Sequence, residues 1–470
     1  MSMVVQHNMQ AANANRMLGI TSGAQAKSTE KLSSGYKINR AADDAAGLTI
    51  SEKMRKQIRG LDKASSNAQD GVSSVQTAEG ALTEVHSMLQ RMNELAVQSS
   101  NGTNSSDDRQ AIQDEVDQLT TEIDRVAETT KFNEIYLLKG DNSNTKNVYM
   151  KGHDAGLKGT LTDGAKSATF TMDALQAGDK YTIAGKEYTI GSATTEVTAL
   201  IDKANTDATA DTANKTVDVN GKTYTITYNA AGNTIADADG TAITLDDLKK
   251  AVTGGSKVTY GNTSLTAMTD ADTDGVDDDD SSIITKDVAE TKIKAELLTA
   301  NNIGTVDQAA TVEDANTANG KTSYTINKGY ATVADTLSFN LHVGADADMT
   351  NKITVDIDTM NSANLGIKGI NVKDASGTEA TYAIDAIADA VAKVSSQRSA
   401  LGAVQNRLEH TIDNLDNISE NTSSAESRIR DTDMAKEMVN YSKNNILAQA
   451  GQSMLAQANQ SNQGVISLLQ

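Results

Sequence analysis

An acidic stretch near the middle of the chain has residue types and a spacing that can bind calcium. It reads TDADTDGVDDDD over residues 269–280, with carboxylates at alternate positions before a glycine, as at the start of a calcium loop. Ser281 occupies the twelfth place, where such a loop needs a bidentate glutamate. The missing glutamate favours a solvated acidic loop over a weak calcium site. The candidate ligands are Asp270, Asp272, Asp274 and Asp278.

Other residues that could do chemistry do not form a catalytic pattern. The five histidines are scattered singly, and none belongs to the H-E-x-x-H pair of a helical zinc site. The chain also lacks the G-x-x-x-x-G-K-[ST] loop that binds phosphate. Asp43 and Asp44 are adjacent in RAADDAAGL, on or beside a predicted helix, where capping or salt bridging accounts for them. We therefore expect no enzymatic activity and no cofactor.

Composition limits the class of protein further. A chain of 470 residues exceeds one average core, so two to four domains are expected. Cysteine is absent, which excludes disulfides and thiolate metal sites. Proline is also absent, although average usage would supply roughly 23, and its absence suits long unkinked helices. The net charge of -21 opposes binding to nucleic acid and to acidic membranes.

Hydropathy gives no sign of a membrane segment. No window approaches eighteen apolar residues, and the opening MSMVVQHNMQ has neither the basic region nor the apolar run of a secretory signal. We expect a protein that stays in the cytoplasm or leaves the cell by a route that hydropathy does not reveal.

Three long segments carry an apolar residue every three or four positions, a pattern that we call a stripe. The helices that these stripes predict must position any functional surface. The first runs from Met54 to Leu95 in steps of three or four residues, and as one helix it would span on the order of 60 Å. After the turn NGTNSS at 101–106, a second stripe over 112–126 runs back along the first. A third stripe lies at 384–415. Stripes at both ends of the chain predict one bundle closed by distant segments.

Between the stripes, residues 141–336 are rich in Thr, Asp, Gly and Ala. Alternating runs such as YTIAGKEYTIG, VDVNGKTYTITYN and KTSYTINKG predict strands and hairpins with Asn-Gly or Gly-Lys turns. We therefore expect a mainly α protein with an inserted β-rich region. Its N- and C-terminal segments would form a long antiparallel helical bundle, discontinuous in sequence, and the insertion one or two small outer α+β domains.

Both ends of the chain keep apolar residues, although termini usually fray. These segments are rich in Ala, Gln, Asn and Ser and are too weakly hydrophobic to form a core alone. Two interpretations stay open: the ends order when other copies of the chain dock, or they fold back on the bundle of the same monomer. The candidate packing residues are Val5, Met9, Met434, Met438, Leu447, Met454, Leu455, Val465, Ile466, Leu468 and Leu469.

Several long blocks of sequence resemble bacterial flagellin. They begin KSTEKLSSGYKINRAADDAAGL at residue 27, LQRMNELAVQSSNGTNSSDDR at 89, EIDRVAETTKFN at 122 and SRIRDTDMAKEMVNYSKNN at 427. The resemblance covers roughly 1–140 and 337–470. It implies an inner filament-core domain (1–43 and 431–470), a helical rod (44–140 and 337–430, with a β-element at 337–367) and a variable, surface-exposed β-rich insertion (141–336).

The resemblance implies a structural subunit that self-assembles through its terminal helices into the flagellar filament used for swimming. Such a protein is secreted by the flagellar route without a cleavable signal peptide. Its implied partners are further copies of itself, the flagellar cap, hook-junction proteins, an export chaperone at the C-terminal helix and, for the monomer, the animal toll-like receptor 5. A hook-filament junction protein, which shares the terminal helices, and a secreted coiled-coil adhesin or binding module are the alternatives.

The motif QRMNELAVQ marks a candidate contact surface. In the family, the receptor contact centres on an Arg and a Leu of this motif and on a Glu of the returning helix. Asn93 stands where many strongly receptor-active flagellins have a second Arg. Periodicity assigns Leu95 to the buried stripe, whereas the resemblance makes it part of an exposed contact. The candidate residues for receptor or subunit contact are Gln90, Arg91, Glu94, Leu95, Gln98 and Glu115.

Overall fold

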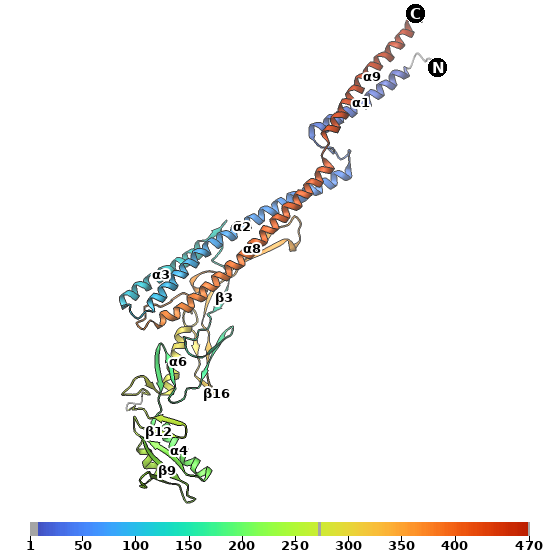
Figure 1. Ribbon diagram of the computed structural model, residues 1–470. Coiled ribbons are helices and arrows are strands. Elements are labelled where there is room, and N and C mark those ends of the chain that lie inside the picture. The colour runs from blue at the N-terminus through green and yellow to red at the C-terminus, as the bar shows by residue number, and fades with distance from the viewer. Residues whose placement is uncertain (1–7, 271–273, 469–470) are drawn as a thin grey trace. The chain divides into compact units, whose positions relative to one another are not determined.

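A computed structural model describes residues 8–270 and 274–468, with side chains up to residue 461 (Figure 1). Long helices come from the two ends of the chain and the β-strands lie between them in sequence, which confirms the predicted fold class. No helix in the described ranges is long and apolar enough to cross a membrane. The long helices are α1 (Met9–Ser34), α2 (Ala45–Ser99), α3 (Ser106–Thr129), α8 (Thr378–Arg430) and α9 (Met434–Leu468).

The chain forms two compact units, each assembled from separated segments. The first contains Met1–Val75, Phe339–Val355 and Gly402–Gln470, and the second contains Gln76–Ser338 and Asp356–Leu401. Helices α2 and α8 contribute residues to both units.

In the first unit, the N-terminal part of α2 packs against the C-terminal part of α8. Ser65 Oγ donates to Asp416 Oδ1 over 3.0 Å, and Leu61, Ala64 and Leu415 form a small buried cluster beside it. A second cluster joins both helices to a hairpin of β19 (Leu337–His342) and β20 (Lys352–Ile357), with the short η1 (Met349–Asn351) between the strands. Gly71 lets Leu341 pack closely on α2, because a Cβ at this position would push the Leu341 side chain aside.

In the second unit, the predicted stripe of α2 forms the core of the bundle with α3 and α8. Helix α3 begins with a capping box between Ser105 and Asp108 and returns from the end of α2. Arg398 Nη2 of α8 lies 3.4 Å from Glu79 Oε1 of α2, so an ion pair joins the two helices. The buried residues of α2 include Val75, Ala78, Leu82, Val85, Leu89, Met92 and Leu95.

The β-rich insertion contains two separate hydrophobic cores. One lies under helix α6 (Lys286–Asn301), which packs on a sheet of order β15-β17-β5-β4, with β16 also paired to β17, and on a smaller sheet of order β14-β7-β6. The strands are β4 (Thr160–Asp163), β5 (Ser167–Asp173), β6 (Lys180–Ile183), β7 (Lys186–Ile190), β14 (Ile283–Ile284), β15 (Thr311–Val312), β16 (Asn316–Ala318) and β17 (Lys321–Asn327).

The other core belongs to a module nested inside the first. A six-stranded antiparallel sheet of order β11-β10-β9-β8-β12-β13 is packed by α4 (Thr194–Asp211). The module enters and leaves at one place, because Ser192 pairs with Ala267 and Met268 N donates to Ser192 O over 3.0 Å. Its other elements are β8 (Lys215–Val219), β9 (Lys222–Thr227), β10 (Thr234–Asp237), β11 (Ala242–Ile243), α5 (Leu245–Lys250), β12 (Lys257–Tyr260) and β13 (Thr263–Thr266).

Two pairs of strands and one short helix connect the insertion to the helices of the second unit. Strands β3 and β18 form an antiparallel pair, and the hairpin of β1 and β2 follows α3 directly. The short helix α7 is held to α3 by Asp124, whose carboxylate accepts from Ser362 N and Oγ over 2.7 and 2.8 Å. The bounds are β1 (Lys131–Phe132), β2 (Ile135–Tyr136), β3 (Asp141–Tyr149), β18 (Tyr330–Asp335) and α7 (Ser362–Leu365).

Candidate functional site

The first candidate site is the pair formed by α1 and α9, which we call the terminal pair. Asn8 Nδ2 of the α1 cap donates to Ala458 O of α9 over 3.1 Å, and Gly451 lets α9 approach Leu18. Of the described residues of the two helices, Ser28 and Ala448 are buried. Because Ala448 is the one apolar side chain buried among these described residues, packing inside the pair contributes little stability.

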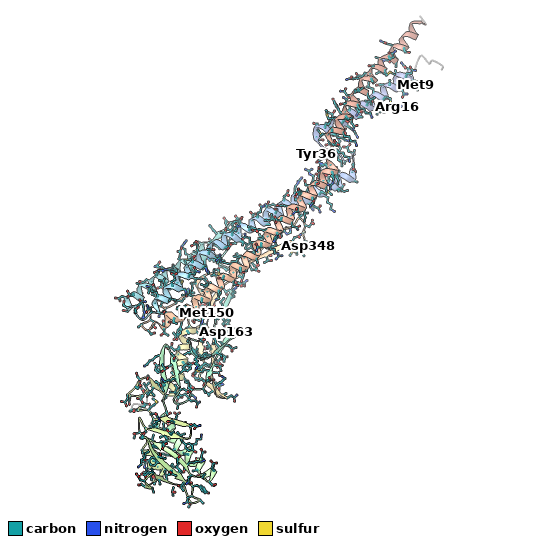
Figure 2. All side chains as sticks on the ribbon, viewed as in Figure 1. Met9, Arg16, Tyr36, Met150, Asp163 and Asp348 are labelled. Atoms are coloured by element: carbon teal, nitrogen blue, oxygen red, sulfur yellow. The ribbon has the colours of Figure 1, made fainter. Side chains whose placement is uncertain are left out.

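The terminal pair instead exposes large apolar side chains. A groove of about 750 Å³ runs between the helices and is lined by residues that include Met17, Leu18, Leu447 and Met454. Figure 2 labels Met9 and Arg16 on the α1 side of the pair. Apolar side chains in such numbers on one element indicate a contact surface. Those with large exposure are Met9, Met17, Ile20, Met434, Met438, Val439, Ile446, Leu447 and Met454.

The predicted packing residues of the ends thus divide into two groups. Met9, Met434, Met438, Leu447 and Met454 are exposed, and Leu455 is half-buried. The remaining ones lie outside the residues whose side chains the structure describes, namely Val5, Val465, Ile466, Leu468 and Leu469.

The second candidate site is a polar surface on α2 and α3, which we call the Arg91 surface. Arg91 Nε donates to Glu115 Oε1 over 2.9 Å, and Arg91 Nη1 donates to Glu94 Oε2 over 3.1 Å. Gln90 and Gln98 are exposed on the same face of α2, because positions three, four and seven residues apart fall on one side of a helix. The structure therefore brings together five of the six residues predicted for this contact.

The ion pairs of the Arg91 surface orient its side chains but add little to the free energy of unfolding. The hydrogen bond that Arg91 donates to Glu115, followed by the one that it donates to Glu94, raises the pKa of Arg91 above its ordinary value. All three side chains are largely solvent-exposed, and exposed ion pairs of this kind contribute little net free energy. Their effect is to hold a guanidinium and two carboxylates in a defined constellation across two helices.

The sixth predicted contact residue is not on this surface. Leu95 is 2% exposed and packs inside the bundle of α2, α3 and α8, so the expectation of an exposed Leu95 is wrong and the periodicity argument is confirmed. The apolar side chain that does reach solvent beside the Arg91 surface is Val97, which is 51% exposed. A helix buries one stripe only, and Val97 falls outside that stripe.

Arg109 positions this end of the bundle, although it was not among the residues predicted for a site. Its side chain is 4% exposed and donates to four backbone carbonyls. Two of these, Ser99 O and Asn101 O, belong to the end of α2 and its turn, at 3.1 and 3.3 Å. The other two belong to Asp374 and Ala375, before α8. One guanidinium thus ties together the α2–α3 turn and the segment that precedes α8.

The acidic residues singled out from the sequence have structural partners. Asp44 Oδ1 accepts from Gly47 N over 2.9 Å at the start of α2, and Asp43 accepts from the backbone of Arg40 and Asn39. The hydrogen bond from Arg40 is the main cause of a lowered pKa at Asp43. Helix capping therefore accounts for Asp44, and backbone hydrogen bonds with a salt bridge to Lys27 account for Asp43.

The proposed calcium loop shows turn geometry. Asp270 accepts from Asp274 N and Gly275 N, each over 3.1 Å, while Asp272 lies outside the described residues. In the ranges 8–270 and 274–468, no group of three or more His, Cys, Asp or Glu side chains is arranged to hold a metal ion. Calcium binding through Asp270, Asp274 and Asp278 stays a hypothesis from sequence.

Comparison with protein families identifies the helical regions at both ends of the chain. Residues 5–143 match the bacterial flagellin N-terminal helical region, and residues 384–469 match the C-terminal helical region. The chain is 40% identical to flagellin of Clostridium tyrobutyricum over 98% of this chain and 100% of that protein. It is 35% identical to flagellin of Salmonella rubislaw over 100% of both chains.

Solved structures of flagellar proteins also align with the chain. FliC from Burkholderia pseudomallei matches with 19% identity and a TM-score of 0.29, covering 72% of this chain and 99% of that one. The junction protein FlgL from Legionella pneumophila matches with 13% identity and a TM-score of 0.31, covering 81% and 99%. Because both TM-scores are low, the family assignment rests on the two relatives by sequence, which align with this chain over their whole length. By that similarity the chain belongs to the bacterial flagellin family, the structural subunits of the flagellar filament.

Proposed function

We propose that the terminal pair drives assembly of this chain into a helical filament with other copies. The observation that carries the proposal is the row of exposed apolar side chains on α1 and α9, beside a groove with almost no internal core. Burying a large apolar side chain contributes about 1.5 to 3 kcal/mol, so several of them together can offset the entropy lost on assembly. Contacts between unlike faces of successive copies give an open helical polymer rather than a closed ring.

The proposal assigns a place to each part of the chain. Residues 1–43 and 431–470 form the inner core of the filament, and 44–140 with 337–430 form the rod around it. Residues 141–336 then project from the filament surface. The polar strand faces of the insertion support this position, since alternate residues of β5 and β17 are half-buried Thr and Ser that water can solvate.

A pair of deletions tests the proposal. Removal of residues 1–43 and 431–470 should leave a folded monomer that forms no filaments after seeding, as judged by sedimentation and electron microscopy. The matched control is removal of the nested module, residues 193–267, whose ends lie side by side and can be rejoined by a short linker. The control should still polymerise. Filaments from the end-deleted protein would contradict the proposal.

The Arg91 surface is proposed as the part of the monomer that toll-like receptor 5 recognises. Support comes from the exposure of Gln90, Arg91, Glu94, Gln98 and Glu115 and from the ion pairs that pre-organise three of them. Pre-organised charged groups add specificity at a protein interface more than raw affinity. The same surface would pack against neighbouring subunits in the filament, so the receptor would bind monomer.

A second pair of variants tests receptor recognition. Arg91→Ala should weaken binding of the monomer to the purified receptor ectodomain, because it removes the centre of both ion pairs. The control is Arg125→Ala, which breaks a similarly exposed pair with Glu122 on α3 outside the Arg91 surface. Equal receptor affinity for the two variants would remove the Arg91 surface from the proposal.

The exposed apolar face of α9 also supports the proposed export route. Before assembly, that face needs a cover, which an export chaperone bound to the C-terminal helix would supply. The proposed route is secretion through the flagellum, followed by insertion under the cap and above the hook-junction proteins. Pull-down of the chaperone from cytoplasm by the full chain, but not by a chain that ends at residue 430, would support this order of events. Chaperone capture by both chains would contradict it.

A further inference from the structure

A pocket lies beside α8 in the second unit and shares no lining residue with the Arg91 surface. Its volume is about 300 Å³, which is enough for a small organic molecule. Figure 2 labels Met150, which follows β3 and forms part of the wall. The apolar part of the lining is Met150, Ile303, Leu365, Gly366, Ala386 and Ala392. The polar part is Lys151, His153, Asp389, Lys393 and Ser396.

Two lysines of this pocket differ in their partners. Lys151 Nζ lies 2.9 Å from Asp389 Oδ1, and its side chain is 62% exposed. Lys393 is more buried, and its Nζ donates to the backbone oxygen of Asn364 over 2.8 Å. A carbonyl oxygen stabilises an ammonium group less than a carboxylate does, so Lys393 has given up water without gaining a direct ion pair.

Two carboxylates near Lys393 do not compensate for the water that its ammonium group has lost. Asp389 on α8 and Asp358 after β20 both act to keep Lys393 protonated. Asp389 is shared with Lys151 and with His153, whose Nε2 lies 3.5 Å from Asp389 Oδ2. Desolvation outweighs these charges and lowers the pKa of Lys393.

Asp358 itself is already paired with another lysine. Its Oδ1 accepts from Lys146 Nζ over 2.8 Å and from Thr336 Oγ1 over 2.6 Å. In contrast with Lys393, the hydrogen bond to Asp389 raises the pKa of Lys151. The two lysines of one pocket are therefore shifted in opposite directions.

We propose that the pocket is a binding site for small apolar aldehydes, which Lys393 captures as an imine. A partly desolvated amine in an apolar pocket is the arrangement in which lysine acts as a nucleophile toward carbonyl groups. The free electron pair of Nζ attacks the carbonyl carbon and a proton moves from nitrogen to oxygen, which gives a carbinolamine. Loss of that hydroxyl as water, with the second nitrogen proton, leaves the C=N bond. No oxidant or reductant is consumed.

The experiment compares the two lysines in the same molecule. The full chain, as monomer, is treated with butanal and cyanoborohydride, which reduces any imine to a stable alkylamine, and the modified peptides are quantified by mass spectrometry. Near pH 7, Lys393 should be labelled faster than Lys151, by about tenfold for each unit that separates their pKa values. The excess should shrink as the pH rises and Lys151 also loses its proton.

Formaldehyde and two variants separate the pocket from simple amine reactivity. Butanal must enter the apolar pocket, whereas formaldehyde needs little space, so Ala392→Leu should slow labelling of Lys393 by butanal more than by formaldehyde. Lys393→Arg should remove the label at that position and leave Lys151 unchanged, with circular dichroism confirming the fold. Faster labelling of Lys151 at every pH, or an equal effect of Ala392→Leu on both aldehydes, would overturn the proposal. The outcome is independent of filament assembly.

Discussion

Replacement of Met17 and Met454 by glutamine tests whether the groove of the terminal pair holds the filament together. The two methionines line the same groove, one from each helix, and are 55% and 64% exposed in the monomer. Glutamine has nearly the length of methionine and a similar helix propensity, so the exchange removes apolar character with little cost to either helix. The monomer should keep its circular-dichroism spectrum.

The expected loss follows from the apolar surface that neighbouring copies would cover. Complete burial of a methionine side chain contributes about 1.5 to 3 kcal/mol, and somewhat more than half of each side chain is still available, so each contributes about 1 to 2 kcal/mol on assembly. For Met17 and Met454 together the loss is about 2 to 4 kcal/mol per subunit. Since about 1.4 kcal/mol corresponds to a factor of ten, the critical concentration should rise about 30- to 700-fold.

The assay is seeded elongation followed by sedimentation, which measures the monomer concentration left in equilibrium with filaments. The control is Asn15→Gln with Asn459→Gln, two exposed polar positions on the same helices that do not line the groove. The control should change the critical concentration little. A rise of less than about threefold for the methionine pair would refute the assignment of the groove to subunit contact.

Three further substitutions test the second unit by urea unfolding. Leu95→Ala should lower the free energy of unfolding by about 2 to 5 kcal/mol, because the side chain is buried. Arg109→Ala should lower it by about 3 kcal/mol or more, since several buried carbonyls lose their donor. At Asp358, desolvation acts to raise the pKa, but hydrogen bonds from Lys146 and Thr336 outweigh it and hold the pKa below its ordinary value of 3.8. Ionised Asp358 therefore stabilises the folded state fully above about pH 4, and this stabilisation is lost as the pH falls through the pKa that Asp358 has in the folded protein. Asp358→Asn should therefore make the free energy of unfolding depend less on pH in the acid range.

The long helices and several hairpins could be predicted because their signals are local. Apolar residues every three or four positions predict the buried face of α2, and the stripe runs through Leu82 and Leu89 into Leu95 as observed. Asn220 and Gly221 take positive φ values of 53° and 80° between β8 and β9, as an Asn-Gly hairpin requires. Each of these features depends on residues within a few positions of one another.

The nesting of one module inside another could not be read from the sequence. The alternating runs of β6–β7, β8–β9 and β16–β17 look alike, yet they belong to different sheets. Partner choice between similar strands depends on which apolar faces share a core, and residues far apart in the chain supply those faces.

For the candidate sites as well, some features follow from the sequence and others depend on the tertiary structure. The sequence by itself determined the stripes, the polar face with Arg91 and the apolar character of both ends, because periodicity and composition are properties of the chain. Only the tertiary structure decided that Met17 and Met454 share one groove. The tertiary structure likewise placed Lys393 beside a backbone carbonyl rather than a carboxylate. Burial and pairing are properties of neighbours in space, and in this protein those neighbours come from segments hundreds of residues apart in sequence.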